Sequence, residues 1–299
     1  MKALIVQNAY IKNQSQISQS ERIAEELFAL GVEAEIKKNF NLARIADNSV
    51  AAQKYDFCIF LDKDRVAARL LERSGLRLFN TAAAMETCDD KMLTNAALSG
   101  AGINLPDCFY APLCYYSGAQ PNDGFLRQVA SSLGFPLVAK INYGSLGAGV
   151  SLIKNYAELE SYERANITAP HFYQKFIACA AGENIAGEDI RVIVVGGKAL
   201  CAMKRKNDND FRSNIELGGR GENYPMDGEL SSLCERVAAI LNLDYCGVDV
   251  LTGENGERYI CEVNSNAFFA AAERACGVNV AKAFAEHAVN AAKRSASRR

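Results

Sequence analysis

The sequence has no tryptophan and only two histidines among its 299 residues. It also has no apolar run of the roughly 18 residues that a membrane-spanning helix requires. Lysine and arginine number 33 and aspartate and glutamate 35, so the net charge of −2 gives no overall field that attracts nucleic acid. The hydrophobic fraction of 49% and the charged fraction of 23% are ordinary for a globular protein. We expect neither nucleic-acid nor membrane partners.

Ten cysteines are present, yet no two of them form a CxxC pair. Cys58, Cys201, Cys246 and Cys261 fall inside apolar segments predicted as strands, where a free thiol behaves as a small hydrophobic group. This pattern predicts reduced thiols and a cytoplasmic protein. The apolar start at residues 1–6 is too short for a signal peptide and is predicted to be a strand.

The first 84 residues alternate predicted strands with predicted helices, which indicates a small parallel α/β sheet. A polar loop at 7–20 follows the first strand, at the edge where open α/β sheets usually bind ligands. No GxGxxG motif follows that strand, so a dinucleotide site is not supported. The predicted strands are 2–6, 32–36, 55–61 and 76–79, and the predicted helices are 21–30 and 64–73.

A second unit is predicted to begin near residue 84, and it contains strands joined by hairpins as well as helices. Its predicted strands are 108–111, 135–140, 150–153, 172–177, 189–195, 199–205, 246–250 and 259–264. Its predicted helices are 87–98, 125–133, 227–241 and 278–292.

A glycine-rich turn with Gly144, Ser145, Gly147 and Gly149 follows the strand that ends in Lys140. Closely spaced glycines let backbone N–H groups approach phosphate oxygens, and the lysine supplies a compact cation. The turn is not a P-loop, because no GKS or GKT ends it and a strand follows it. The pattern is compatible with phosphate binding and also with a simple flexible hairpin.

Three oxygen-bearing side chains fall on two neighbouring predicted strands. Asp249 belongs to the first strand, while Glu262 and Asn264 belong to the second and share a face, since strand side chains alternate. An antiparallel pair would bring all three together. Carboxylate and amide oxygens suit Mg²⁺, which completes its shell with phosphate oxygens and water. The alternative is a sheet edge with solvated acidic side chains.

A polar cluster, Asp210-Phe-Arg-Ser-Asn214, lies in the segment 207–221, which is too long for a simple turn. Loops of this length commonly carry function. The guanidinium of Arg212 can bind phosphate oxygens through two parallel hydrogen bonds. The alternative is that Arg212 only pairs with Asp210 on a solvated loop.

The order of these segments resembles the ATP-grasp superfamily and, within it, the RimK-like amino-acid ligases of the α-L-glutamate type. The resemblance is strong over residues 85–290, whereas residues 1–84 match the family's preATP-grasp domain only in pattern. It is carried by Asp90-Lys91, 136–140, the glycine-rich turn, 174–177, Asp189-Ile-Arg191, 210–214, 247–249 and 262–264.

The fold that the resemblance implies is α/β, with an α+β ATP-grasp part. A preATP-grasp α/β domain at 1–84 precedes a two-subdomain ATP-grasp fold at 85–299. The implied subdomains are a lid-bearing part at 85–172 and a metal and catalytic part at 173–299.

The resemblance also implies roles for single residues. Lys91, Lys140 and the glycine-rich turn would contact ATP phosphates, and the hinge at Lys175 and Phe176 would bind adenine through its backbone. Asp189 would lie near the nucleotide. Arg212, Ser213 and Asn214 would face ATP and the acyl substrate, with Arg212 and Asn214 as catalytic residues. Mg²⁺, for which Mn²⁺ can substitute, would be held by Asp249, Glu262 and Asn264.

Two positions depart from the family pattern. Lys175 occupies a hinge position that is commonly acidic in relatives, so its side chain receives no nucleotide role from the resemblance alone. The run Asn264 to Phe269 replaces a commoner Asn-x-Ser-Pro-Gly run. Phe268 and Phe269 are predicted to pack under the last helix, with a place in the acceptor pocket as the alternative. Arg274 is either a substrate clamp or a surface charge.

The activity that the resemblance implies is ATP-dependent ligation of a carboxylate to an amine through an acyl phosphate, with release of ADP and phosphate. The amine would be glutamate or a similar amino acid. The acceptor would be a small molecule, a peptide or a protein, and a homo-oligomer is one option. The alternatives are a D-alanine–D-alanine-type or glutathione-synthetase-type ligase and a catalytically silent nucleotide-binding regulator. The segment 178–188 and the cluster at 210–214 favour the RimK type.

Overall fold

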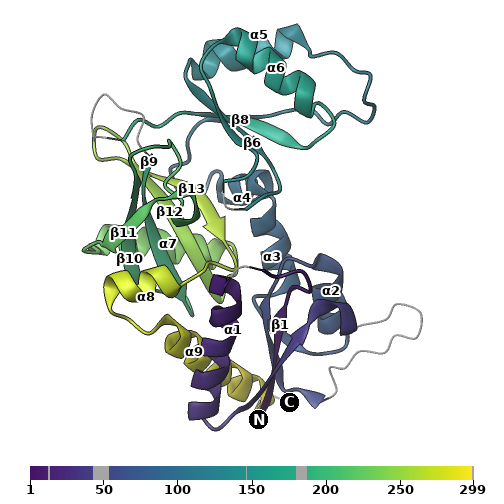
Figure 1. Cartoon of the computed structure of the whole chain (residues 1–299), viewed down its shortest axis with the longest axis vertical. Coiled ribbons are helices and arrows are strands. Elements are labelled where there is room, and N and C mark those ends of the chain that lie inside the picture. Colours follow the sequence, from purple (N-terminus) through teal and green to yellow (C-terminus); the bar gives the residue numbers. More distant parts are fainter. Residues whose placement is uncertain (13, 43–53, 146, 180–186, 298–299) are drawn as a thin grey trace.

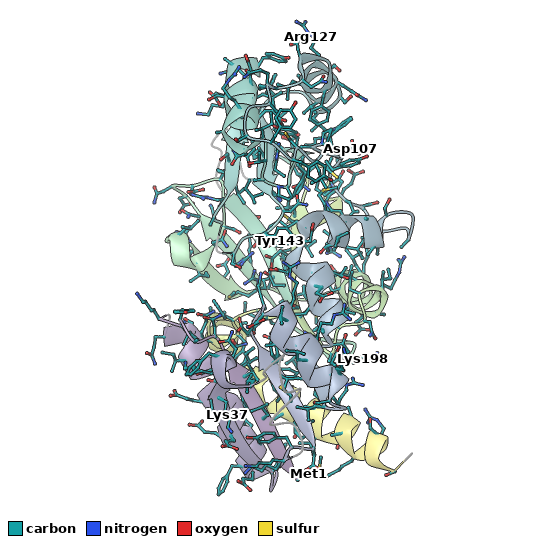
Figure 2. All side chains as sticks on the ribbon, turned by 90° about the vertical axis from the view of Figure 1, so that its right-hand side faces the viewer. Met1, Lys37, Asp107, Arg127, Tyr143 and Lys198 are labelled. Carbon is teal, nitrogen blue, oxygen red and sulfur yellow. The ribbon has the colours of Figure 1, made fainter. Side chains whose placement is uncertain are left out.

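The computed structural model describes residues 1–12, 14–42, 54–145, 147–179 and 187–297. In these ranges three sheets follow one another along the long axis of the molecule, with an upper, a middle and a lower unit (Figure 1). In the turned view, Arg127 and Asp107 mark the upper unit and Met1 and Lys37 the opposite end, with Tyr143 between them (Figure 2). None of the described helices is long and apolar enough to cross a membrane.

The lower unit is the parallel α/β sheet that the sequence predicts, with the strand order β2-β1-β3-β4. Helix α2 begins after Asp64, whose side chain accepts a hydrogen bond from the Ala67 N–H as an N-cap. The strands are β1 (Lys2–Gln7), β2 (Glu33–Lys38), β3 (Phe57–Leu61) and β4 (Arg77–Phe79), with helices α1 (Gln14–Ala29) and α2 (Arg65–Arg73) and the 3₁₀ turn η1 (Asn39–Asn41).

Helix α1 begins at Gln14, so the prediction of a polar loop at 7–20 is wrong for much of that segment. Two polar side chains of this region, those of Gln19 and Ser20, are buried because they find specific partners. Gln19 is buried and donates a hydrogen bond of 3.0 Å to the Ala267 carbonyl, far along the chain. The predicted end at Gly31 is confirmed, since this glycine has φ of +74°.

Two helices replace the single helix predicted at 87–98. They are α3 (Ala82–Asp89) and α4 (Lys91–Leu98). Asp90 leaves the helical conformation with ψ of 109°, and its carboxylate caps α4 by accepting from the N–H groups of Met92 and Leu93. The cap, and not a continuous helix, satisfies the first turn of α4. The boundary predicted near residue 84 falls inside α3.

The upper unit is an antiparallel sheet of order β5-β8-β6-β7, covered by two helices (Figure 1). The hairpin between β6 and β7 carries the glycine-rich turn, as the sequence predicts. The prediction contained no helix between β7 and β8, where α6 is found. The elements are β5 (Cys108–Tyr110), α5 (Asp123–Leu133), β6 (Leu137–Ile141), β7 (Val150–Ile153), α6 (Tyr156–Asn166) and β8 (His171–Lys175).

The middle unit is a five-stranded sheet of order β11-β10-β9-β12-β13 with antiparallel neighbours. Both predicted hairpins are confirmed, and β12 aligns Asp249 with Glu262 of β13. The segment 207–221 is not entirely loop, because it contains η3 and the start of β11. The elements are β9 (Gly187–Val195), β10 (Lys198–Asn207), η3 (Ile215–Leu217), β11 (Arg220–Asn223), α7 (Gly228–Ile240), β12 (Tyr245–Thr252), β13 (Arg258–Asn264), α8 (Ala270–Cys276) and α9 (Val280–Ala296).

One hydrophobic core joins the lower and middle units. Helices α1 and α9 lie between the two sheets, and buried side chains of β1, β3, β9 and β12 pack against them. Ile5, Leu27, Ile193 and Phe284 belong to this single cluster. The upper unit has a core of its own, built from residues 109–173. The lower and middle units therefore form one body, to which the upper unit is attached.

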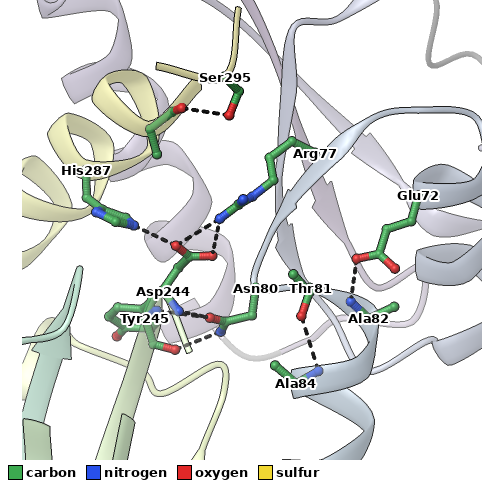
Figure 3. A network of polar contacts seen from close by, with 11 residues as sticks. Glu72, Arg77, Asn80, Thr81, Ala82, Ala84, Asp244, Tyr245, His287 and Ser295 are labelled. Carbon is green, nitrogen blue, oxygen red and sulfur yellow. Dashed lines mark hydrogen bonds and ion pairs between the residues drawn. The ribbon is translucent and has the colours of Figure 1, made fainter. Parts of the chain in front are cut away.

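A buried asparagine fastens the same two units together (Figure 3). The side-chain amide of Asn80 donates to the carbonyl groups of Tyr245 and Ser265 at 2.7 and 2.8 Å. Its oxygen accepts from the backbone N–H groups of Asp244 and Tyr245 at 2.7 and 3.0 Å. The Asp244 carboxylate in turn pairs with Arg77 and accepts from His287 of α9 at 2.7 Å.

Candidate functional site

A cavity of about 110 Å³ lies where the upper sheet faces the middle sheet. The glycine-rich turn covers it from above, and the ends of β9, β10, β12 and β13 form its lower wall. Its lining includes thirteen of the fifteen residues predicted for the site, namely Lys91, Lys140, Gly144, Ser145, Gly147, Lys175, Phe176, Asp189, Arg212, Ser213, Asn214, Asp249 and Glu262.

The two remaining residues lie just outside this lining. Gly149, with φ of +73°, packs against Ile141, where an added Cβ would come within 3.0 Å of that side chain. Its role in the described structure is to let the hairpin close. Asn264 lines a second cavity next to the first, which it shares with Glu262.

Lys140 lines the first cavity and carries its ammonium group on a strand that is otherwise apolar. The residue is only 7% exposed, and its Nζ atom lies 3.7 Å from the sulfur of Cys261 and 5.9 Å from the centre of the Phe172 ring. Within the described part of the chain, no carboxylate comes within ion-pair distance of this ammonium. Burial raises the pKa of the Cys261 thiol, so it is a neutral neighbour. A buried cation that lacks a counter-charge favours binding of an anion.

Three cations from three different elements hold the glycine-rich turn over the cavity. Lys91 Nζ donates to the Gly144 carbonyl at 3.0 Å, and Arg212 Nη1 donates to the Gly147 carbonyl at 2.9 Å. Lys63, in the loop that follows β3, donates to the Ser145 hydroxyl at 3.1 Å. Gly147 has φ of +76° and lies against Arg212, so a side chain here would be strained.

Arg212 makes the pair with Asp210 that the sequence offered as the alternative to phosphate binding. Its guanidinium pairs with both oxygens of Asp210, at 3.0 and 2.7 Å, which raises the pKa of Arg212. The same side chain reaches the glycine-rich turn across the cavity. The prediction of a purely solvated pair with Asp210 is therefore incomplete. Ser213 is buried, and its hydroxyl donates to Asp189 at 2.6 Å.

Two arginines and two aspartates of the middle sheet form a buried network of charges beside the cavity. Arg191 donates to both oxygens of Asp249 at 2.7 Å, and Arg205 bonds to Asp189 and lies 2.9 Å from Asp249. Burial alone would lower the pKa of Arg205, but the two carboxylates outweigh it and raise that pKa. Burial would raise the pKa of Asp249, but the two arginines lower it. The Asp249 carboxylate is thus held in the ionised form.

The oxygens expected to bind a divalent cation are partly free. Glu262 is half-buried, and the one ion pair it makes in the described residues is with Lys91 at 3.4 Å. The side-chain nitrogen of Asn264 and the oxygen of Asn266 are buried without hydrogen-bond partners. Turning the side-chain amide by 180° exchanges its nitrogen and its oxygen, so Asn264 can present its oxygen instead. The oxygens of Glu262 and Asn264 are of the kind that fits a magnesium ion, whereas both oxygens of Asp249 already accept from Arg191.

The hinge after β8 supplies the inner wall of the cavity. Phe176 and Ile177 line it, and the side-chain nitrogen of the buried Gln174 lacks a hydrogen-bond partner there. The exposed Lys175 borders the same wall. Most of the predicted insertion at 178–188 lies outside the described residues.

The two phenylalanines that follow Asn266 separate in the structure. Phe269 is buried in the core that joins the units, as predicted, while Phe268 lines the second cavity. Arg274 is exposed and borders a small hollow between α1 and α8, away from the other site residues.

Sequence reasoning assigned no role to four residues that the structure brings to the two cavities, namely Asp62, Lys63, Arg191 and Arg205. One available signal was the period of two along β10. Arg205 lies on the same face of the strand as the buried residues Cys201 and Met203. The alternation therefore predicts that the Arg205 side chain is buried. Asp62 and Lys63 gave no comparable signal, because their position depends on how the lower unit docks.

A glycine-rich hairpin on one antiparallel sheet, closed over a second sheet that carries lysine, arginine and acidic side chains, is the arrangement of an ATP-grasp protein. A family model described as a RimK-like ATP-grasp domain matches residues 88–288. The chain therefore belongs to the RimK-like ATP-grasp family.

Similar proteins were found by sequence and by structure. Human beta-citrylglutamate synthase B is 34% identical over 233 residues, which cover 77% of this chain and 57% of that protein. The chain thus spans little more than half the length of such relatives. The ATP complex of D-alanine–D-alanine ligase from Bacillus anthracis superposes with a TM-score of 0.74 at 20% identity, over 100% of this chain and 99% of that one. The ATP-grasp ligase PsnB with a precursor variant, Mg and ADP gives 0.71 at 17%, over 97% and 98%.

Proposed function

We propose that this protein is an ATP-dependent ligase that joins an amino acid to a carboxylate and releases ADP and phosphate. The observation that carries this proposal is Lys140, a buried ammonium without a carboxylate partner in the described residues, placed beneath a glycine-rich turn. A phosphate group is the natural counter-ion for such a site.

The nucleotide would occupy the cavity between the upper and middle sheets. Lys140 and Lys91 would hold its phosphates together with the glycine-rich turn, and the hinge at Phe176 would receive the adenine. The unpartnered amide of Gln174 offers a further donor at that wall. Entry of ATP would involve a movement of the upper unit away from the middle sheet, as in enzymes whose lids close over the substrate. Separate hydrophobic cores for the upper unit and the rest support such a movement.

Mg²⁺ would be held by Glu262, Asn264 and Asp249, with Mn²⁺ as a substitute. When bound, the metal neutralises phosphate charge. The arginines behind Asp249 keep that carboxylate ionised and fixed in orientation. Glu262, the more accessible of the two acids, is free to turn from Lys91 toward the cation.

The carboxylate substrate needs activation, because a carboxylate is a poor electrophile. ATP supplies the phosphoryl group that turns it into an acyl phosphate, from which an amine then displaces phosphate. Arg212 is the guanidinium in the cavity best placed to stabilise the developing charge, since it already spans from Asp210 to the glycine-rich turn. Asn214, which lines both cavities, would help to orient the acid.

The amine is proposed to be glutamate or a similar amino acid. This rests on membership of the RimK-like family and on the name of the beta-citrylglutamate synthase relative. The acceptor would be a small carboxylate or a peptide, as the PsnB complex with its precursor illustrates for another member of the fold.

The test is to incubate the protein with ATP and Mg²⁺, a panel of acids and hydroxylamine, and to measure hydroxamate together with ADP. Hydroxamate with ADP and phosphate is expected. AMP with pyrophosphate as products would contradict the acyl-phosphate route. Failure of every acid to stimulate ADP release would contradict the ligase assignment.

Arg212→Lys should bind ATP almost normally and lower kcat by about 10²–10³, the typical effect of losing one transition-state donor. The matched control is Arg220→Lys, because Arg220 is exposed on β11 and pairs only with Asp208 in the described residues. A fully active Arg212→Lys variant would leave the arginine with a purely structural role beside Asp210.

A further inference from the structure

A second cavity, of about 360 Å³, opens beside the first at the edge of the lower sheet. Ser145, Asn214 and Glu262 line both cavities, so the two spaces meet at these residues. The lower sheet contributes the loops that follow β1 and β3, and the middle sheet contributes the end of β13. The charge in this cavity is set by Asp62, Lys63, Arg191 and Glu262, and Asn8 lies among them.

Asp62 is the charged residue of this cavity that has no counter-charge within the described ranges. It is 8% exposed, and all its hydrogen bonds come from neutral donors. Asn8 Nδ2 donates to its oxygens at 3.1 and 3.3 Å, Asn39 Nδ2 at 2.8 Å and the Lys63 backbone N–H at 2.7 Å. Burial raises the pKa of Asp62, which none of these donors fully offsets.

The other charges around the cavity are already balanced. Lys63 pairs with Asp89 at 2.8 Å, and Arg191 pairs with Asp249 at 2.7 Å. Glu262 has Lys91 at 3.4 Å. A ligand that enters this space therefore meets one uncompensated charge, the carboxylate of Asp62. That carboxylate favours a cationic group.

The surroundings of Asp62 suit an ammonium better than a metal ion. A metal ion requires several oxygen ligands, whereas both neighbouring amides present N–H groups to the carboxylate. The Asn8 side-chain oxygen is occupied by the Tyr10 N–H at 2.8 Å. An ammonium needs only acceptors, and a fixed carboxylate is the strongest of them.

We propose that Asp62 binds the ammonium group of the amino-acid substrate, so that the second cavity is the site of the amine. This assignment rests on the proposed ligase function. It places the amine at the edge of the lower sheet, next to the point where Glu262 and Asn214 connect the two cavities. The carboxylate to be activated then occupies the first cavity, on the other side of these residues.

The first experiment compares free and acetylated ligands on the wild-type protein with a non-hydrolysable ATP analogue and Mg²⁺. L-Glutamate, L-aspartate and glycine are titrated beside their Nα-acetyl forms, and dissociation constants are measured by calorimetry or ligand-observed NMR. At least one free amino acid is expected to bind about 10- to 100-fold more tightly than its acetyl form, the range of one charge-assisted hydrogen bond. Equal binding of both forms, or no ammonium-dependent binding in the set, overturns the proposal.

The second experiment uses two isosteric variants. Asp62→Asn should abolish the preference for the free ammonium and raise the KM for the amine, while hydroxamate formation from the acid persists. Asp64→Asn is the matched control, because Asp64 caps α2 and also accepts from Asn39 but does not line the cavity. An unchanged preference in Asp62→Asn overturns the proposal.

The two proposals can fail separately. Ammonium-dependent binding without ADP release would contradict the ligase function and leave the Asp62 site standing. Ligation with an unchanged KM in Asp62→Asn would do the opposite. If Asp62→Asn does not fold, the comparison of free and acetylated ligands on the wild-type protein decides.

Discussion

The burial of Lys140 bears both on the stability of the protein and on its proposed chemistry. The strand β6 is buried along Leu137 to Lys140, and its last buried side chain is a cation. Such a position costs stability, because the ammonium loses water and gains only a thiol and an aromatic ring in return. The cost is understandable if the site exists to bind an anion.

Lys140→Ala should therefore weaken ATP binding by about 10- to 100-fold, the range of one charged hydrogen bond. The melting temperature without nucleotide should not fall, since a buried unpaired charge is removed. Calorimetric titration and thermal unfolding of the same samples measure both quantities. Lys154→Ala, at an exposed position just after β7, is the control. A large loss of melting temperature with unchanged ATP affinity would make Lys140 a structural residue.

Some residues of the site can be predicted from the sequence immediately around them, and others cannot. Lys140, Arg212 and Glu262 could be predicted because each belongs to a short segment with its own composition. Arg205 and Asp62 could not, since their environments are made by segments far away in sequence. Asp62, for example, is held by residues 8 and 39.

At the scale of elements, the hairpins and strands agree with the sequence better than the helix ends do. Period-two alternation and glycine turns are local signals. They predicted the three hairpins that join β6 to β7, β9 to β10 and β12 to β13. The start of α1 was missed because its first residues are polar, and because the burial of Gln19 depends on a tertiary contact to Ala267. The break at Asp90 was missed because an aspartate can either continue a helix or cap one.

The upper unit contains a buried polar group whose role is structural. Glu163 of α6 accepts hydrogen bonds from His171 Nε2 at 2.8 Å and from the Tyr173 hydroxyl at 2.5 Å. Burial would raise the pKa of Glu163, but these hydrogen bonds outweigh it and lower that pKa below 4.5. The carboxylate therefore ties α6 to β8.

A lowered pKa in the folded state means that ionised Glu163 stabilises the protein above pH 4.5, and that this stability is lost as the pH falls through the folded-state pKa. Glu163→Gln should lower the unfolding free energy at pH 7, and the gap to wild type should narrow in acid. Hydrogen exchange of β8 as a function of pH measures this. Glu160→Gln, exposed on the same helix, should change little. A gap that stays constant with pH would contradict the assignment.

At the scale of the whole molecule, Asn80 adds a polar attachment to the hydrophobic core that joins the lower and middle units. All four of its side-chain hydrogen bonds go to backbone groups of the middle unit. Asn80→Ala should lower the unfolding free energy by on the order of 3 kcal/mol, because buried backbone groups lose their partners. Thr81→Ala removes only the cap of α3 and should cost about 1 kcal/mol. Similar values for both variants in urea denaturation would contradict this role.

The core that encloses α1 and α9 also sets an order of events during synthesis on the ribosome. One face of the lower sheet, formed by residues 3–79, is covered only by α1 until residues 280–296 have emerged, because α9 completes its cover. The upper unit is contiguous between residues 108 and 175 and closes its own core without later segments. A nascent chain should thus fold the upper unit before it completes the core that the lower and middle units share. Until α9 has been made, the strands of the lower sheet are the ones most in need of a chaperone.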